Sequence, residues 1–194
     1  MDIGRAGPDD YSEIYELMAA NSDRNLSPTD RKKGFLSATF TLRQIADMAA
    51  DLGILVARDK ERVVGVMCAS RCDFADQPPV VRSMVAEFDR VRFQDQPLNE
   101  YSVFLYGPVC IAPAYRGRGL LRALYQAIRR ELDGKCDVGV AFVSEANPHS
   151  LEAHVQGLGM SEVGRFTHDE HGYRILAFPI GVAHEGENIA RGRD

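Results

Sequence analysis

The sequence predicts a mixed α/β fold in which helices flank a central, twisted and mostly antiparallel sheet. Two segments, 54–70 and 164–180, each hold two strand-like runs joined by a short polar turn, which is typical of a β-hairpin. A strand-like segment at 101–111 is followed by a glycine-containing turn and a helical pattern. The continuous apolar run at 138–143 is typical of a buried parallel strand.

The N-terminal part is predicted to hold a short strand followed by helices. Residues 3–5 are strand-like, and helical patterns follow at 9–21, 27–36 and 41–53. Each helical pattern begins with Asp, Ser or Thr, residue types that cap helix starts well. The second also has a proline directly after its cap, where the missing N–H costs nothing.

The first hairpin, 54–58 with 63–70, is separated from the next strand by an unusually long connection, 71–100. A helix is predicted inside this insertion, beginning near Pro79. Its apolar face consists of Val81, Met84, Val85 and Phe88. A long connection that carries its own helix is often functional. The insertion either shapes a substrate pocket or only covers an edge of the sheet.

The strand at 101–111 leads into a candidate anion site. Pro113 ends this strand, because proline cannot donate to a β-ladder, and the next helix begins near Leu120 and ends before Gly134. The helix start carries Arg116, Gly117, Arg118, Gly119 and Arg122. The first N–H groups of a helix attract anions, and glycines let a phosphate approach the backbone. The alternative is an ordinary tight turn before a surface helix.

The glycine turn fits neither of two common phosphate motifs. Arg122 stands at the third glycine position of a dinucleotide fingerprint, and the Gly-Lys-Ser/Thr of a Walker loop is absent. The stretch instead resembles the acetyl-CoA motif of the GNAT superfamily of N-acetyltransferases. That motif has Arg or Gln first, here Arg116, Gly fourth, here Gly119, and Gly or Ala sixth, where this chain has Leu121. The resemblance implies a pyrophosphate site formed by Arg116, Gly117, Arg118, Gly119, Leu120, Leu121 and Arg122.

A second segment resembles the same family. Asn147, followed by a proline, is a typical helix start, and Ser150 and His154 lie one turn apart on one face before Gly159 ends the helix. The family often has Asn, a small residue, Tyr or His, and Gly-Phe in this order. The resemblance, which covers about 54–180, implies that Asn147 and Ser150 bind acetyl-CoA. It also implies that His154 is the acid that protonates the leaving thiolate, a role more often filled by tyrosine.

The resemblance also assigns roles on the strand at 101–111. Family members splay this strand so that its backbone meets the pantetheine arm and the thioester. The matching positions are Val109, Cys110 and Ile111. Some members use a glutamate on this strand as the general base, but its interior holds no carboxylate here. Glu100 at the strand start and the phenol of Tyr106 are the catalytic candidates, and a bound water is the alternative.

The composition argues against several classes of binding partner and cellular location. A net charge of -5 over 194 residues argues against nucleic acid as the main partner. No apolar run approaches the roughly 20 residues of a membrane span, and no signal peptide is expected. The four cysteines lie at no zinc-like spacing, so they are expected to be reduced thiols in the cytoplasm, and no metal site is predicted.

We therefore expect a single domain over 1–180, with a helical insertion at about 71–100, and a flexible tail over 181–194. The leading hypothesis is an acetyl-CoA-dependent N-acetyltransferase that transfers the acetyl group directly to a primary amine in a ternary complex. The alternatives are a non-catalytic acyl-CoA-binding sensor or partner-binding module, and a nucleotide-binding protein. The acceptor stays open among small amines, amino acids, antibiotics, peptide N-termini and protein lysines. Acyl groups other than acetyl and a homodimer also stay open.

Overall fold

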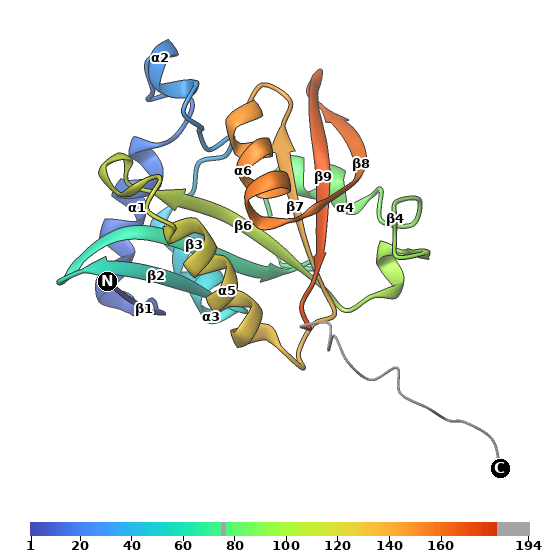
Figure 1. Cartoon of the computed structure of the whole chain (residues 1–194), viewed down its shortest axis with the longest axis horizontal. Coiled ribbons are helices and arrows are strands. Elements are labelled where there is room, and N and C mark those ends of the chain that lie inside the picture. The colour runs from blue at the N-terminus through green and yellow to red at the C-terminus, as the bar shows by residue number, and fades with distance from the viewer. Residues whose placement is uncertain (75–76, 182–194) are drawn as a thin grey trace.

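The computed structural model describes residues 1–74 and 77–181, and Figure 1 shows a twisted central sheet with helices on both faces. The strands are β1 (Asp2–Arg5), β2 (Gly53–Asp59), β3 (Arg62–Arg71), β4 (Arg92–Phe93), β5 (Gln96–Pro97), β6 (Val103–Ile111), β7 (Val138–Ser144), β8 (Ser161–His168) and β9 (His171–Pro179). The helices are α1 (Tyr11–Ala20), α2 (Pro28–Arg31), α3 (Leu42–Ala50), α4 (Pro79–Val85), α5 (Leu120–Leu132) and α6 (Pro148–Leu158). Short 3-10 turns η1 (Pro8–Asp10), η2 (Leu98–Glu100) and η3 (Pro113–Tyr115) complete the described elements.

The described strands form a seven-stranded sheet in the order β1-β2-β3-β6-β7-β9-β8, and β4 and β5 pair separately. Every neighbouring pair in the large sheet is antiparallel except β6 and β7, which run parallel. The predicted mixed α/β fold around a mostly antiparallel sheet is therefore confirmed. Both predicted hairpins are present, as β2–β3 and β8–β9.

Helices cover the two faces of the sheet unequally. In Figure 1, α5 and α6 lie on one face, whereas α1 and α3 lie on the other. The inward face of α5 holds Leu120, Leu124, Ile128 and Leu132, each 5% exposed or less. Burying each such side chain stabilises the fold by roughly 1.5–3 kcal/mol. This packing fixes the start of α5 against the sheet, which matters for the site described below.

The insertion at 71–100 covers part of the second face of the sheet. Its apolar side chains join one buried cluster with residues of β6, β7, β8 and β9. The members from the insertion are Val80, Met84, Phe88, Val91, Phe93 and Leu98. The Ser83 hydroxyl also lies 2.9 Å from Nδ1 of His168 in β8. The predicted helix is present as α4, and it covers the sheet as one of the two interpretations expects.

The N-terminal helices differ from the prediction in two details. The second helix ends at Arg31 rather than near Leu36, because the chain turns at Gly34 (φ 98°) and the backbone of Leu36 bonds to Asn21. Leu42, expected on the buried face of α3, is 49% exposed because it is the first residue of the helix. The predicted cap is present: the Thr41 hydroxyl accepts from the backbone N–H three residues later.

The predicted flexible tail over 181–194 lies outside the described residues except for Gly181. The carbonyl of Gly181 accepts a hydrogen bond from Nη2 of Arg129 at 3.2 Å.

Candidate active site

The site begins where β6 and β7 separate. The two strands are paired from Val103 to Leu105 on β6, opposite Val138 to Val140 on β7, and the described pairing extends no further. Just beyond this point the register of β6 against β3 shifts, with Tyr106 and Val109 as the flanking paired residues. The bulge at Gly107-Pro108 lies in this shift. Backbone groups on the β7 side of β6 are therefore free of β7 and open to a ligand.

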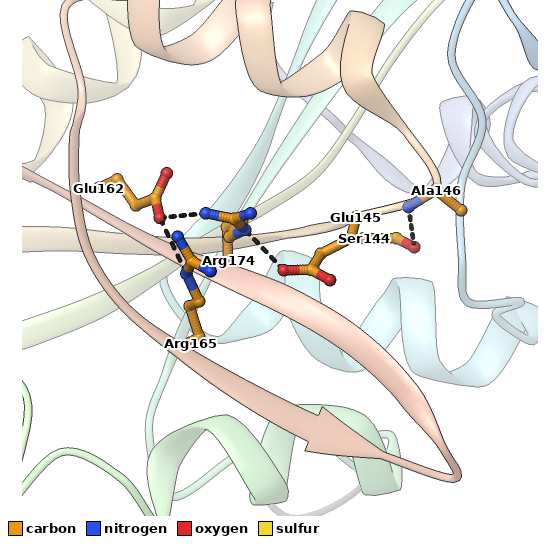
Figure 2. Close-up of polar contacts among 6 residues, drawn as sticks. All are labelled: Ser144, Glu145, Ala146, Glu162, Arg165 and Arg174. Atoms are coloured by element: carbon orange, nitrogen blue, oxygen red, sulfur yellow. Dashed lines mark hydrogen bonds and ion pairs between the residues drawn. The ribbon is translucent and has the colours of Figure 1, made fainter.

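A polar network holds the carboxyl end of β7 to the last hairpin instead. Figure 2 shows Arg174 of β9 between two carboxylates, and its Nε donates to Glu145 at 2.7 Å. Its Nη1 donates to Glu162 of β8 at 2.6 Å, and Arg165 reaches the same oxygen at 3.4 Å. The Arg174 guanidinium lowers the pKa of Glu162. These contacts add to the backbone pairing of β7 with β9, which runs from Val138 to Ser144 and so continues beyond the point where the pairing with β6 ends.

A cavity of about 140 Å³ occupies the opening, and we call it the β6–β7 cavity. It is lined from the α6 side by Tyr106, Ala141, Val143, Asn147, Ser150 and His154. Its other lining residues are Phe35, Leu36, Ser37, Ala38, Phe40, Gln44, Met48, Ser70, Phe74, Gln77, Pro78, Val81, Met84, Leu105, Val140 and Phe142. The bulge residues Gly107, Pro108 and Val109 and the strand end Ser144 also line it. One cavity thus joins the two faces of the sheet.

His154 and Tyr106 are the titratable side chains among the described residues that line this cavity. His154 is 5% exposed, and its Nδ1 lies 2.7 Å from the carbonyl oxygen of Ser150 and 3.4 Å from the Ser150 hydroxyl. A carbonyl can only accept, so Nδ1 carries the proton and Nε2 of the neutral ring keeps a lone pair. Burial lowers the pKa of His154, against a smaller opposing effect of the Ser150 carbonyl.

This environment changes the expected role of His154. The sequence predicts a proton donor, which requires the imidazolium. Burial disfavours that cation, and at neutral pH the ring is mainly neutral with Nε2 as a proton acceptor. The geometry therefore favours a base at this position rather than an acid.

Tyr106 places a protonated phenol in the β6–β7 cavity beside His154. Its ring centroid lies 5.7 Å from that of His154, and its ring also packs edge-on against Tyr125 and Phe178. Burial raises the pKa of Tyr106 well above the usual 10. Its buried hydroxyl has no hydrogen-bond partner within 1–74 and 77–181. An unpaired buried hydroxyl costs about 1–3 kcal/mol, so this group fits a role as donor to a bound ligand.

Glu100 lies away from these groups. It is exposed, it ends η2 before β6 begins, and it is not part of the cavity wall. Residues 101–106, which include the first part of β6, separate it from the bulge. The structure brings Tyr106 and His154 together and does not bring Glu100 to them.

The start of α5 has the features of an anion site. Gly117 (φ 71°) and Gly119 (φ 79°) both adopt the left-handed conformation, and a Cβ at either would meet nothing within 4 Å. Gly119 is the N-cap residue and has no side chain to cap the helix. The first N–H groups of α5 therefore lack a capping side chain, and the space beside the two glycines is open, as a pyrophosphate requires. The residues present fit this part of acetyl-CoA.

The arginines and leucines around this helix start have different surroundings. Arg118 is exposed and lies over the Tyr115 ring at 5.5 Å. Arg122 donates to the carbonyl of Gly157 at 2.5 Å and so ties α5 to the end of α6. Leu120 is buried against the sheet, and Leu121, at the position usually taken by Gly or Ala, is half-buried.

Arg116 links three segments of the fold by hydrogen bonds. Its guanidinium donates to the carbonyls of Ile111 at 3.1 Å and Lys33 at 2.9 Å, and to Oδ1 of Asn21 at 2.6 Å. These bonds tie the glycine turn to the end of α1 and to the segment that leads into the cavity wall. The first motif residue therefore orders the turn rather than presenting an unpaired charge.

We expect Arg116→Ala to lower the free energy of unfolding by about 2–4 kcal/mol, because three hydrogen bonds are lost and a buried Asn21 oxygen loses its donor. Urea unfolding followed by circular dichroism measures the change. Arg118→Ala is the matched control from the same turn, and it should leave stability nearly unchanged while weakening acetyl-CoA binding. Equal stability of the two variants would contradict the bracing role.

Asn147 and the strand residues contribute in different ways. Asn147 is 4% exposed, and its Oδ1 caps α6 by accepting from Ser150 N while its Nδ2 donates to Phe35 O at 3.0 Å. Val109 lines the cavity, and Ile111 pairs with β3. The side chain of Cys110 is buried toward α1, with Sγ 3.7 Å from the Leu17 carbonyl, and Cys110 is not among the described residues that line the cavity.

Sequence reasoning missed the cavity wall formed by 35–40, Phe74 and Gln77. These residues reach the site through contacts with elements far away in sequence, such as the Asn147 bond to Phe35. The two phenylalanines at 35 and 40, between short helices, were an available signal. Among the described residues, no group of three or more His, Cys, Asp or Glu side chains could hold a metal ion. No helix in the described ranges has both the length and the apolar character needed to cross a membrane.

Comparison with known proteins gives a consistent picture. The model of the acetyltransferase (GNAT) family matches residues 14–160. A search of curated proteins finds no match. Among solved structures, smu.2055 from Streptococcus mutans UA159 is similar with a TM-score of 0.62 and 18% identity, covering 93% of this chain and 100% of that one.

Two further structures have the same fold. The ribosomal-protein-S18-alanine N-acetyltransferase from Escherichia coli has a TM-score of 0.60 and 13% identity, covering 97% of this chain and 98% of that one. The structure of yncA from Salmonella typhimurium with its cofactor acetyl-CoA has a TM-score of 0.59 and 17% identity, covering 97% of this chain and 99% of that one.

Proposed function

The chain belongs to the GNAT acetyltransferase family, and from this premise we propose that it transfers the acetyl group of acetyl-CoA to a primary amine within the β6–β7 cavity. One observation carries the proposal: a single cavity is lined both by the bulge of β6 with His154 and by a separate wall on the opposite face. In this proposal the acceptor occupies the cavity, and the thioester borders it at the bulge of β6. The named activity of the Escherichia coli neighbour and the acetyl-CoA bound to yncA support the same reaction class.

We propose that the start of α5 holds the pyrophosphate of acetyl-CoA through the N–H groups of Leu120, Leu121 and Arg122, with Arg118 supplying positive charge. The backbone of β6 near Val109, freed by the separation from β7, borders the thioester end. When bound, acetyl-CoA supplies an acetyl group activated as a thioester.

In this proposal the amine nitrogen bonds to the acetyl carbon, the C–S bond breaks and CoA leaves as a thiolate. His154 takes the proton that the nitrogen loses, and Tyr106 donates a hydrogen bond. A protonated amine cannot attack, and an alkylamine resembles lysine, whose pKa is about 10.4. Nε2 of neutral His154 accepts the proton that the amine loses, because Nδ1 is held by Ser150. The Tyr106 hydroxyl, protonated and otherwise unpaired, donates toward negative charge that develops in the cavity.

The environment of the cysteines supports direct transfer without an acyl-enzyme. Cysteine is absent from the described wall of the cavity. Burial raises the pKa of Cys110 to about 12 and that of Cys68 still higher, so neither forms a ready thiolate.

Release of free thiol from acetyl-CoA, measured with and without a panel of primary amines, tests the proposed function. We expect amine-dependent release that saturates in both substrates. Calorimetry with acetyl-CoA, CoA and ATP runs beside it. Tight acetyl-CoA binding without amine-dependent release would favour the acyl-CoA-binding module, and preferential ATP binding would favour a nucleotide site.

A further inference from the structure

Outside α6 and its cap, the described wall of the β6–β7 cavity is mainly apolar, with Ser37, Gln44, Ser70 and Gln77 as polar side chains. Much of it comes from three separate parts of the chain. Phe35 and Phe40 come from the segment before α3, Met48 from α3, and Phe74, Val81 and Met84 from the insertion. Figure 1 shows α3 and α4 on the same side of the sheet, away from α5 and α6. The acceptor side of the cavity is therefore built largely from side chains that favour an apolar ligand.

Within residues 1–74 and 77–181, no Asp, Glu, Lys or Arg side chain belongs to this wall. None of these side chains in the same ranges lines the rest of the cavity, and His154 is neutral at neutral pH. A second ammonium or a carboxylate on the acceptor would lose its hydration without gaining a counter-ion from the described wall. This wall therefore disfavours polyamines, aminoglycosides and free amino acids.

Most amides of the wall already have partners. The Gln77 side chain donates to the carbonyls of Arg71 at 3.0 Å and Cys72 at 2.8 Å. Asn147 bonds to Phe35 and Ser150, and the Gln44 amide oxygen accepts from Thr41. A peptide acceptor brings several backbone N–H and C=O groups, each of which needs a partner when buried. Besides these amides, the described polar side chains of the wall are the hydroxyls of Ser37 and Ser70, which are too few to partner a peptide backbone, so the wall disfavours a peptide chain.

The size of the cavity limits the apolar body of the acceptor. Its volume is about 140 Å³, and an apolar protein cavity of about 150 Å³ accepts benzene. We propose that the acceptor is a small primary monoamine whose uncharged apolar body is about the size of one aromatic ring, as in an arylalkylamine or a branched alkylamine. This inference rests on the proposed function and names its substrate class.

Matched pairs of test amines measure this preference in the wild-type protein. Pentylamine and 1,5-diaminopentane differ by one terminal ammonium, and 2-phenylethylamine and phenylalanine differ by one carboxylate. The monoamine of each pair should have a kcat/KM at least about 10²-fold higher. Along the linear alkylamines, kcat/KM should rise about fourfold per methylene until the cavity is filled.

The panel separates failure of this inference from failure of the proposed function. Equal or better acetylation of 1,5-diaminopentane, phenylalanine or an alanine-initiated peptide would overturn the inference and keep the acetyltransferase. Acetylation of no amine at all would overturn the proposed function and the inference with it.

Two substitutions on α4 test the position of the acceptor wall. Val81 lines the cavity, whereas Val85, one turn later, is not among the described residues of the cavity wall and lines a second groove with Cys72 and Cys136. Val81→Asp should lower kcat/KM for 2-phenylethylamine at least tenfold and raise that for 1,5-diaminopentane, because a carboxylate then faces the acceptor. Val85→Asp should leave both preferences as in the wild type. The same shift in both variants, or in neither, would overturn the assignment of this wall to the acceptor.

Discussion

Replacing His154 with alanine is expected to lower kcat by about 10²- to 10⁴-fold, the range for a lost acid–base group. Acetyl-CoA affinity should change little, because the phosphates are assigned to the start of α5. Steady-state thiol release gives kcat, and calorimetry gives the affinity. The matched control is His149→Ala, since His149 is exposed on the first turn of the same helix and should not affect the rate.

The dependence of the rate on pH distinguishes a base from an acid at this position. Burial lowers the pKa of His154 below its usual value near 6.5. A neutral base is then present above that pKa and is lost as pH falls through it, so kcat/KM should fall on the acidic side. A weakly basic acceptor amine keeps the ionisation of the acceptor out of this range. A decline on the alkaline side of a histidine-like pKa would instead support the acid that the sequence predicts.

His154→Tyr gives an independent test of the same point. Tyrosine presents a neutral phenol, which donates but is a poor acceptor at neutral pH. The base role predicts that this variant stays as slow as His154→Ala. Recovery of part of the rate would show that a proton donor is what the reaction needs here.

Gly119→Glu is expected to weaken acetyl-CoA binding by at least about 10²-fold. The side chain would enter open space beside the uncapped start of α5 and place a negative charge where the pyrophosphate is proposed to bind. The left-handed backbone at this position also strains any residue with a Cβ. Calorimetry measures the affinity, and thermal unfolding shows whether the variant is folded.

Gly134→Glu is the matched control for this substitution. Gly134 also has a left-handed backbone (φ 72°) and open space where a Cβ would lie, but it follows the opposite end of α5. Both variants should lose similar stability, and Gly119→Glu alone should lose acetyl-CoA affinity. Equal affinities of the two folded variants would remove the pyrophosphate from the start of α5.

Local patterns predicted the parts of the fold that depend on neighbouring residues. The caps at Ser27, Thr41 and Asn147 are present because each side chain bonds to an N–H three residues on. The buried run at 138–143 forms β7, paired on both sides, and the glycine turn opens α5. The family model over 14–160 confirms the family resemblance.

Long-range contacts decided what the sequence could not show. The pattern placed Ser150 and His154 on one face, but which His154 nitrogen carries the proton depends on the Ser150 carbonyl and on burial. The sequence suggests that Arg116 presents an unpaired charge, yet its guanidinium donates hydrogen bonds to Asn21 and Lys33, which lie far away in sequence. Met84 both packs on the sheet and lines the cavity, whereas Phe88 lies in the packed cluster and is not among the described residues of the cavity wall. That the insertion shapes an acceptor pocket stays a prediction.

The most direct test of the central claim follows the acetyl carbon itself. Acetyl-CoA labelled with ¹³C at the carbonyl is incubated with the wild-type protein and 2-phenylethylamine, and the carbonyl signal is followed by NMR. The account predicts that the thioester signal is replaced by that of an N-acetyl amide, and that this conversion is nearly abolished in His154→Ala. Labelled acetate as the main product, or a thioester signal that persists with every primary amine, would contradict the account.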